Sequence, residues 1–349
     1  MSRLKRVDCS EPGISRRRRG RGFEYIDHEG KRVPAEVVAR IRELAIPPAW
    51  TDVWICRHPN GHLQATGIDA AGRKQYLYHQ RWRERRDQQK FDEMIDFARS
   101  LPRLRKLIRA DLKGGELGRE QVLACALRLL DRGFFRIGSE DYAEQNDSYG
   151  LATIRKEHVR LDDGVIHFDY PAKSGQRRQQ EIADPDAYRI IEKLLRRRSG
   201  GDELLAYKTG RTWADLNSPD INEYIKDATG GDFSAKDFRT WNGTMLAAVA
   251  LARTPGANGS GATRRRAETE AVKTVAHYLG NTPAVCRASY IDPRVFDRYR
   301  SGWTIAAALD GRAEAFGLER ESARETIEEA VIDLITEPDE SPLITSEDA

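Results

Sequence analysis

The sequence predicts an α+β protein with two lobes: a small, mostly antiparallel β lobe first, then a larger, mainly α-helical lobe that contains a three-stranded β meander. Three observations predict this fold class. A chain of 349 residues is long for one hydrophobic core, so two domains are expected. Short strand-like runs separated by Gly-containing turns fill residues 23–79. Apolar residues with helical spacing dominate the later part of the chain.

The first lobe is expected to be built from short elements. Residues 1–22 read as a flexible basic leader, in which the run Arg16–Arg19 is either a phosphate-gripping arm or simply solvated. FEYIDHEGKRVP (23–34) is typical of a hairpin, and AEVVARIRELAI (35–46) of a helix that two prolines end. Residues 50–79 alternate strand-like runs with Asn-Gly and Ala-Gly turns, and the lobe is expected to end near residue 90.

The second lobe is expected to begin with a charged helix over 81–112 that Pro102 breaks. EQVLACALRLLDRGFF (120–135) predicts a core helix. Residues 158–184 alternate around two turns, which predicts the meander with Lys173 at its second turn. Everything from Asp186 onward is helical in period, with PGANGSG (255–261) as a flexible link.

The domain boundaries follow from these patterns. The final residues are acidic and contain prolines, which favours disorder. The expected division is a leader over 1–22, an N-terminal domain over 23–90, a second domain over 91–330 and a disordered tail over 331–349.

Charge is unevenly distributed, although the net charge is only +3. Residues 1–110 hold 25 Lys and Arg against 14 Asp and Glu, whereas residues 301–349 hold 3 against 13. A basic front half and an acidic tail favour a nucleic-acid partner. Ordinary charge fluctuation with an acidic tail is the alternative that charge alone leaves open.

Several classes of protein are disfavoured by what the sequence lacks. The four cysteines have no CxxC or metal spacing, which favours reduced thiols in the cytoplasm. No apolar run approaches the length of a membrane span, and the N-terminus has no signal-peptide core. No Walker A pattern occurs, and a turn between His58 and His62 argues against a helical metal site. The sequence therefore predicts no membrane, metal or nucleotide cofactor.

Four segments of the second lobe and two of the first resemble the type IB DNA topoisomerases, in their poxviral and bacterial branch. The segments are FFRIGSEDYAEQNDSYGLATIRKEHV (134–159), DYPAKSG (169–175), KDFRTWNGT (236–244), VAHYLGNTPAVCRASYIDPRV (275–295), IPPAWTDVWIC (46–56) and GHLQATGIDAAGRKQYLYH (61–79). They occur in the family's order, and together they extend over about residues 23–310. The resemblance implies a two-lobed DNA clamp that acts as a monomer, associated with the nucleoid.

The resemblance also implies a set of catalytic residues. Arg136 and Arg239 take the positions of the arginines that clamp the phosphate, and Lys173 takes that of the general acid for the departing 5′-oxygen. Tyr290 takes the position of the nucleophile, which forms a 3′-phosphotyrosyl link without ATP or metal. Asn281 departs from the family pattern, because poxviral relatives usually hold histidine there and an amide donates only a hydrogen bond.

Six further residues are candidates for DNA contacts. Five of them lie on or beside a probable strand, and the sixth follows the first catalytic arginine; they are Arg73, Lys74, Gln75, Tyr76, Tyr78 and Tyr142. The alternative for the first five is a charged sheet edge with packed tyrosines. His277 is expected to be helix surface or packing, although it is also a candidate substitute for the histidine that Asn281 replaces.

Two other functions remain open. A tyrosine recombinase uses the same arginine, lysine and tyrosine chemistry, but it usually has HxxR at the second arginine, where this sequence reads Lys236-Asp237-Phe238-Arg239. A non-catalytic DNA-binding or nucleoid protein would retain the basic front lobe, yet it would not require Arg136, Lys173, Arg239 and Tyr290 together. Each of these residues taken alone also has an ordinary structural explanation.

Overall fold

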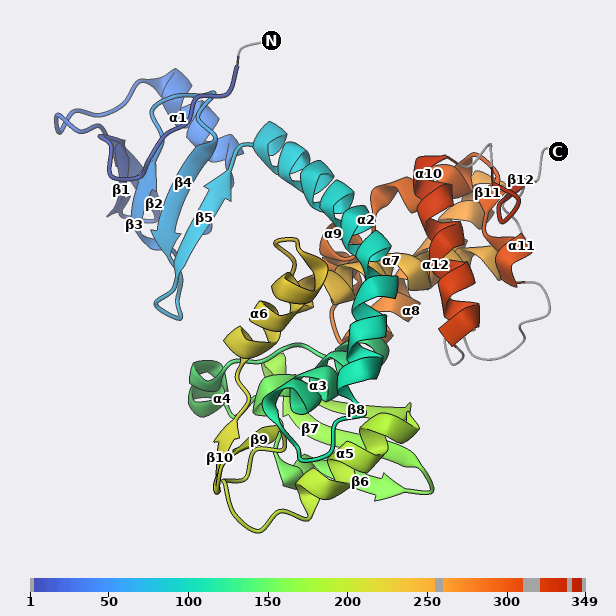
Figure 1. The fold of residues 1–349 in the computed structure, drawn as a ribbon. Coiled ribbons are helices and arrows are strands. Elements are labelled where there is room, and N and C mark those ends of the chain that lie inside the picture. Colours follow the sequence, from blue (N-terminus) through green and yellow to red (C-terminus); the bar gives the residue numbers. More distant parts are fainter. Residues whose placement is uncertain (1–2, 255–259, 310–320, 338–340, 347–349) are drawn as a thin grey trace. The chain divides into compact units, whose positions relative to one another are not determined.

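The computed structural model describes residues 3–254, 260–309, 321–337 and 341–346 (Figure 1). The chain divides into two compact units, Met1–Asp92 and Glu93–Ala349. The expected α+β class is confirmed, with an antiparallel sheet in the first unit and a mainly helical second unit. In the described parts of the chain, no helix is long and apolar enough to cross a membrane.

The first unit is a five-stranded antiparallel sheet with a helix packed on it (Figure 1). The strand order is β2-β1-β3-β4-β5, so β5 is an edge strand. Buried aliphatic side chains of β1, β3, β4 and α1 form its core. The elements are β1 (Ile14–Arg19), β2 (Gly22–Ile26), α1 (Ala35–Glu43), β3 (Thr51–Ile55), β4 (Leu63–Ile68) and β5 (Lys74–Tyr78).

The expected flexible leader is wrong for its arginine run, which forms strand β1. Ile14 is buried in the core, and β1 pairs with both β2 and β3. The Arg16 guanidinium lies 4.2 Å from the Phe23 ring centre and donates hydrogen bonds to the carbonyls of Ile46, Pro47 and Trp50. These contacts hold Arg16 against the protein, although the basic composition of this run suggested a solvated segment. The expected hairpin within 23–34 is present in short form, because Ile26 pairs with Arg32 in an antiparallel bridge and Val33 donates to the Tyr25 carbonyl at 3.2 Å, whereas the longer pairing of β2 is with β1.

Helix α2 (Gln80–Asp111) is continuous, so the expected break at Pro102 is wrong. Proline inside a helix removes one hydrogen bond and crowds the preceding turn. Leu101 and Leu104 on either side of Pro102 are fully buried, and their packing offsets that cost.

Helices form most of the second unit. Helices α3 and α7 are buried along nearly their whole length, as expected for the apolar segment at 120–135. The helices are α3 (Arg119–Gly133), α4 (Glu140–Asn146), α5 (Pro185–Leu195), α6 (Ser218–Thr229), α7 (Ala235–Ala252), α8 (Gly261–Leu279), α9 (Pro283–Ser289), α10 (Pro293–Arg300), α11 (Ala306–Leu309) and α12 (Glu321–Thr336).

The expected meander is confirmed as β6 (Val159–Asp162), β7 (Val165–Ala172) and β8 (Gln176–Ala183). Lys173 lies in the turn η3 (Lys173–Gly175) between β7 and β8. Tyr170 of β7 stands opposite Arg178 of β8. This pairing joins the hairpin that carries Lys173 to the arginines described below.

The helical expectation beyond Asp186 is wrong at two places. Strands β9 (Ala206–Thr209) and β10 (Thr212–Asp215) form a hairpin whose turn uses Gly210 at φ +63°, and β11 (Trp303–Thr304) pairs with β12 (Thr345–Ser346). The expected disordered tail is wrong for its first residues, because α12 continues to Thr336. Its apolar side chains at positions 331, 334 and 335 have helical spacing and are buried. Most of the expected link at 255–261 lies outside the described residues.

A buried ion network ties α7 to its neighbours in the second unit. Asp131 of α3 accepts hydrogen bonds from Arg105 of α2 at 2.9 Å and from Arg324 of α12 at 2.9 Å. Glu328 of α12 accepts from Arg105 at 2.6 Å, and Arg324 donates to the Asn242 amide oxygen of α7 at 2.8 Å. All these side chains are nearly inaccessible. The network therefore fixes α7, which carries Arg239.

Replacing Asp131 with Asn is expected to lower the free energy of unfolding by roughly 2 kcal/mol at neutral pH, because one acceptor oxygen becomes a donor and the negative charge between Arg105 and Arg324 is lost. Denaturant unfolding measures this loss. Asp186→Asn, which alters an exposed pair with Arg189, is the matched control and should change little. An equal effect of the two variants would contradict the prediction.

The same network predicts acid sensitivity. Burial by itself raises the pKa of the Asp131 carboxyl, but the charges of Arg105 and Arg324 outweigh it and hold that pKa well below its usual range. The folded pKa then lies below the unfolded value of about 4. The contribution to stability is therefore complete above that value and is lost as the pH falls through the folded pKa. Asp131→Asn should show less of this loss.

Candidate active site

Three arginines converge on the C-terminal end of helix α8. The carbonyls of His277 and Tyr278 accept hydrogen bonds from Arg178 of β8 at 3.0 and 2.7 Å. The Leu279 carbonyl accepts from Arg239 of α7 at 2.8 Å, and the Gly280 carbonyl accepts from Arg136 at 2.6 Å. The last carbonyls of a helix lack partners within the helix and carry its negative dipole end. Three guanidinium groups supply those partners here.

Gly280 makes this convergence possible. It ends α8 with φ +59°, in the left-handed region that glycine adopts most easily. The backbone N–H of Asn281 then donates to the Ala276 carbonyl at 3.1 Å, which closes the helix end. A Cβ at Gly280 would lie 3.0 Å from the Arg178 side chain, so this position also needs a small residue.

The Tyr290 ring lies beside the Arg239 guanidinium. The Arg239 Cζ atom is 5.2 Å from the ring centre, within the range of a cation–π contact. A Cβ on Gly243 of α7 would lie 2.5 Å from the Tyr290 carbonyl oxygen, so the backbone around Tyr290 packs directly on α7. Thr244 of α7 donates to the same carbonyl at 3.4 Å. The phenol is thereby held, half-buried, against a buried cation.

Asn281 is oriented by Arg136. The Arg136 guanidinium, which can only donate, lies 2.5 Å from the Asn281 Oδ1 atom. The amide nitrogen of Asn281 must therefore point away from it. That Nδ2 atom is buried and has no hydrogen-bond partner within the described residues. A buried donor of this kind requires an explanation, and an acceptor that binds at this site would provide one.

Phe134 connects α3 to this cluster in a strained conformation. Its φ of +56° is in the left-handed region, which costs a residue with a side chain about 1–2 kcal/mol. In this conformation the Phe134 carbonyl accepts a hydrogen bond from Arg239 at 2.6 Å, and its ring packs 5.4 Å from that of Tyr278. The left-handed conformation of Phe134 therefore supplies two contacts, one to Arg239 and one to Tyr278, two residues before Arg136.

Lys173 and Tyr170 belong to the hairpin at this site. Lys173 is exposed at the hairpin turn, whereas Tyr170, three residues earlier, is buried. Burial raises the pKa of Tyr170 to about 12, against the opposing charges of Arg178, Arg239 and Arg136. Tyr170 pairs with Arg178 near the turn, so this end of the hairpin lies beside the arginine cluster. Burial also lowers the pKa of Arg239, which the Tyr290 side chain partly offsets.

Comparisons with known proteins give the family of the chain. The family model of the eukaryotic DNA topoisomerase I catalytic core matches residues 79–307, and that of the bacterial DNA topoisomerase IB N-terminal domain matches residues 22–69. DNA topoisomerase 1B of Acanthamoeba polyphaga mimivirus is 34% identical over 303 residues, covering 83% of this chain and 88% of the relative. The chain belongs to the type IB DNA topoisomerase family.

Two further relatives are less similar and match different shares of the chain. DNA topoisomerase I of monkeypox virus is 20% identical over 272 residues, which cover 74% of this chain and 80% of the relative. DNA topoisomerase 1 of Drosophila melanogaster is 29% identical over 160 residues, which cover 44% of this chain and 15% of that much longer protein. The chain is therefore an isomerase that acts on DNA.

For a topoisomerase, the structure brings together four of the five predicted catalytic residues. Arg136, Arg239, Asn281 and Tyr290 are joined by direct contacts or through the end of α8. Lys173 lies at the exposed turn of the hairpin, and Arg178, close to that turn on β8, reaches the same cluster. Arg178 was missed. Alternation along β8 offers a signal, because residues 178 and 180 share a face with the buried Ile182.

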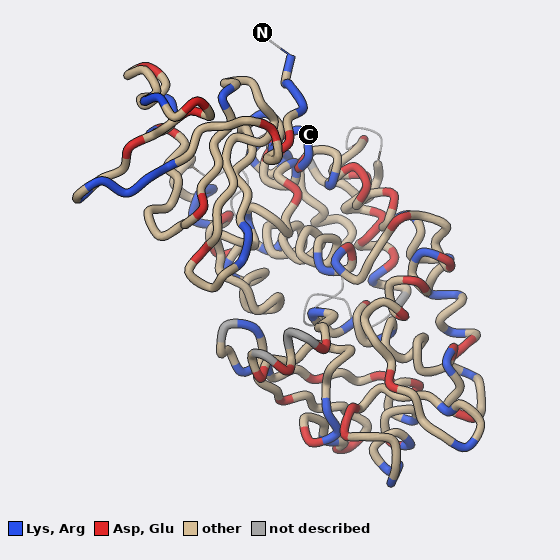
Figure 2. The backbone as a smooth tube through the Cα atoms, turned by 90° about the vertical axis from the view of Figure 1, so that its left-hand side faces the viewer, with Lys and Arg blue, Asp and Glu red and all other residues tan. Residues whose placement is uncertain are grey.

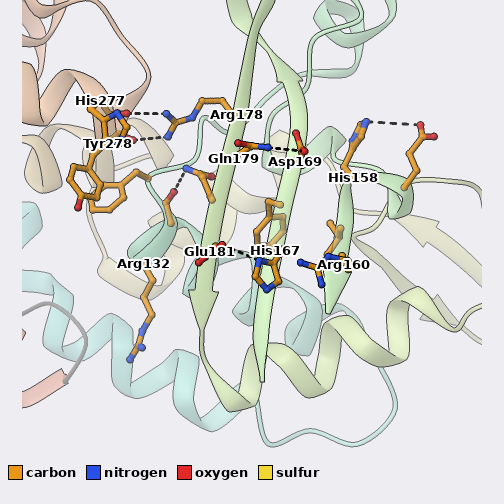
Figure 3. A pocket seen from close by; sticks show the side chains of 16 residues that line it. Arg132, His158, Arg160, His167, Asp169, Arg178, Gln179, Glu181, His277 and Tyr278 are labelled. Atoms are coloured by element: carbon orange, nitrogen blue, oxygen red, sulfur yellow. Dashed lines mark hydrogen bonds and ion pairs between the residues drawn. The ribbon is translucent and has the colours of Figure 1, made fainter. Parts of the chain in front are cut away.

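A cavity of about 920 Å³ opens beside the arginine cluster. Figure 3 shows that it lies between the β6–β8 sheet and the end of α8, and that Arg178 points from the sheet to the His277 and Tyr278 backbone. The His277 carbonyl accepts one of these bonds from Arg178, and the His277 ring packs edge-on against that of Tyr278 with the ring centres 5.6 Å apart. These contacts agree with the packing role expected for His277.

The candidate DNA-contact residues of the first unit lie on and beside edge strand β5. Lys74, Tyr76 and Tyr78 share its exposed face, where the two rings stack at 6.2 Å. Gln75 points to the other face and donates to Asp69 at 2.8 Å, and Arg73 in the preceding turn bonds the same carboxylate. Lys and Arg are interspersed with Asp and Glu along both units in Figure 2. The side chain of Tyr142, in α4, lies outside the described residues.

Proposed function

We propose that this topoisomerase relaxes supercoiled DNA by cutting one strand transiently, with Tyr290 as the nucleophile and no need for ATP or metal. The observation that carries the proposal is the Tyr290 phenol held against Arg239, at the helix end where Arg136 and Asn281 also lie. A nucleophile, positive charge and an unpaired donor are what attack on a phosphodiester requires.

The reaction is a displacement at phosphorus. The Tyr290 oxygen forms a bond to the phosphorus, the bond to the 5′-oxygen breaks, and the phenolic proton leaves to the surroundings. The adduct is a 3′-phosphotyrosine, which retains the energy of the phosphodiester. The free 5′-hydroxyl end then swivels, and its attack on the adduct reverses each step. No nucleotide hydrolysis is needed, because no bond energy is lost.

Arg136 and Arg239 stabilise the transition state in this proposal. Each guanidinium has five N–H donors, and the helix carbonyls, Asn281 and Phe134 occupy only some of them. The remaining donors would bind the non-bridging oxygens, where negative charge accumulates. The Asn281 Nδ2 donor would bind a phosphoryl oxygen, which would satisfy its buried N–H groups.

Lys173 is proposed as the general acid. Its ammonium would give a proton to the departing 5′-oxygen and take it back during religation. Its exposed position at a hairpin turn leaves it accessible to bound DNA. This role makes the hairpin conformation part of the chemistry.

DNA binding is proposed to involve both expected domains. Residues 23–90 would act as a DNA clamp, with Lys74, Tyr76 and Tyr78 on its exposed strand face, and residues 91–330 would carry the chemistry. Phosphate contacts would dominate the affinity, which should then fall steeply with salt. The enzyme is proposed to act as a monomer on nucleoid DNA in the cytoplasm.

The test is relaxation of supercoiled plasmid in EDTA without nucleotide, followed by trapping with SDS. We expect relaxation, and a covalent adduct in which the protein is attached to the 3′ end of the cut strand. Oligonucleotides labelled at one end or the other identify that end. Relaxation that requires a nucleotide or a divalent metal, or protein attached to the 5′ end, would contradict the proposal.

A further inference from the structure

Arg178 joins two parts of the site that the sequence separates. It lies on β8, in the hairpin whose turn holds Lys173, and stands opposite Tyr170. Its guanidinium leaves the sheet and donates to two carbonyls in the last turn of α8 (Figure 3). Asn281 follows that helix end directly. One side chain thus bridges the proposed general-acid hairpin and the proposed phosphate-binding helix end.

Charge and geometry both strengthen the two hydrogen bonds of this bridge. Both bonds are assisted by the guanidinium charge, and both acceptors lie at the negative end of a helix dipole. The guanidinium is fork-shaped, so two bonds to successive carbonyls restrain its direction as well as its distance. A lysine at this position would have a single nitrogen and could not bind both carbonyls in the same way.

Loss of the bridge should not unfold the protein. The two carbonyls border the cavity of about 920 Å³, so water can bind them when the guanidinium is removed. Arg239 and Arg136 would still bind the next two carbonyls of the helix end. What would be lost is the fixed direction of the β7–β8 hairpin relative to α8.

We propose that Arg178 is a positioning residue that holds the Lys173 hairpin against the end of α8, so that the general acid and Asn281 face the same phosphate. The inference rests on the proposed function, because it assigns Arg178 an effect through Lys173. Arg178 itself contacts only protein in this role.

The leaving group provides the test. A 5′-sulfur in place of the bridging 5′-oxygen departs without a proton, so it bypasses the general acid. The substrate is a duplex whose cleavage position has first been mapped with the unaltered enzyme, made with oxygen or sulfur at the cut. Single-turnover formation of the covalent adduct is measured for the unaltered enzyme, Lys173→Ala, Arg178→Ala and Arg178→Lys.

We expect Arg178→Ala to cleave the oxygen substrate about 100-fold more slowly, within the range of a general acid's contribution. The sulfur substrate should restore its rate to within about threefold of the unaltered enzyme, as it should for Lys173→Ala. On the oxygen substrate, Arg178→Lys should cleave at a rate between those of the unaltered enzyme and Arg178→Ala. Arg177→Ala is the matched control, because Arg177 is the adjacent residue, is exposed and pairs with Asp169. It should cleave both substrates normally.

The outcomes separate this inference from the function on which it rests. Equal slowing of Arg178→Ala on both substrates, or no slowing on either, overturns the inference while the proposed function stands. Lys173→Ala that sulfur does not rescue overturns the acid role and the inference together. No adduct with the unaltered enzyme overturns the proposed function itself. Thermal unfolding and DNA affinity of Arg178→Ala close to normal exclude a purely structural role.

Discussion

Tyr290→Phe is expected to abolish plasmid relaxation and covalent adduct formation, with a loss of at least about 10⁴-fold, while DNA affinity stays close to normal. The change removes only the hydroxyl, which is the sole atom of this side chain able to bond to phosphorus. The ring can keep its place beside the Arg239 guanidinium, whose Cζ atom lies 5.2 Å from the ring centre. The fold and the phosphate site should therefore survive.

The measurement is SDS trapping on labelled duplex, with DNA binding measured separately at equal salt concentration. Tyr188→Phe on α5 is the matched control, because it removes a hydroxyl from another half-buried tyrosine. It should form adduct at the normal rate. If the Tyr290 variant still relaxed plasmid, another residue would be the nucleophile and the assignment would be wrong.

Arg239→Lys is expected to slow adduct formation by about 10²–10³-fold, the usual cost of removing one donor to a transition-state oxyanion. Arg239 is only 5% exposed and already binds the carbonyls of Phe134 and Leu279. A lysine ammonium lacks the planar fork that can bind two carbonyls and a phosphoryl oxygen at once. Positive charge near the phosphate remains, so DNA affinity should change little.

Single-turnover adduct formation measures the rate, and thermal unfolding measures the accompanying loss of stability, expected at about 1–3 kcal/mol for one unsatisfied carbonyl. Arg253→Lys, at the C-terminal end of the same helix, is the matched control and should behave normally. A normal rate in Arg239→Lys would show that the guanidinium geometry is not required. The same rate loss in both variants would point to a general effect on α7.

Much of the candidate site was predictable, because its residues lie in segments that resemble one family in one order. Arg136, Arg239, Asn281 and Tyr290 do converge in the structure. Arg178 was not predictable from resemblance, since its role comes from meeting a helix end about 100 residues later in the chain. Periodicity alone indicates that its side chain leaves the sheet on the buried face, but not what it meets there.

The fold was predictable where apolar spacing is strong and failed where tertiary contacts override local signals. The meander and the core helix α3 followed from their patterns. The arginines of β1 carry no apolar alternation, and only their pairing with β2 makes them part of a strand. Pro102 signals a break that the buried leucines around it override. The β9–β10 hairpin was missed because its short strands contain polar residues and no clear apolar alternation.

The main-chain oxygens at the end of α8 hold the Arg136 and Arg239 guanidiniums in place before any DNA arrives. The entropy of these long side chains is therefore lost when the protein folds. Binding of a phosphate then needs little further ordering. Such a site is preorganised. Its catalytic power should then persist up to the temperature at which the second unit melts, without first fading through local loosening of the arginines.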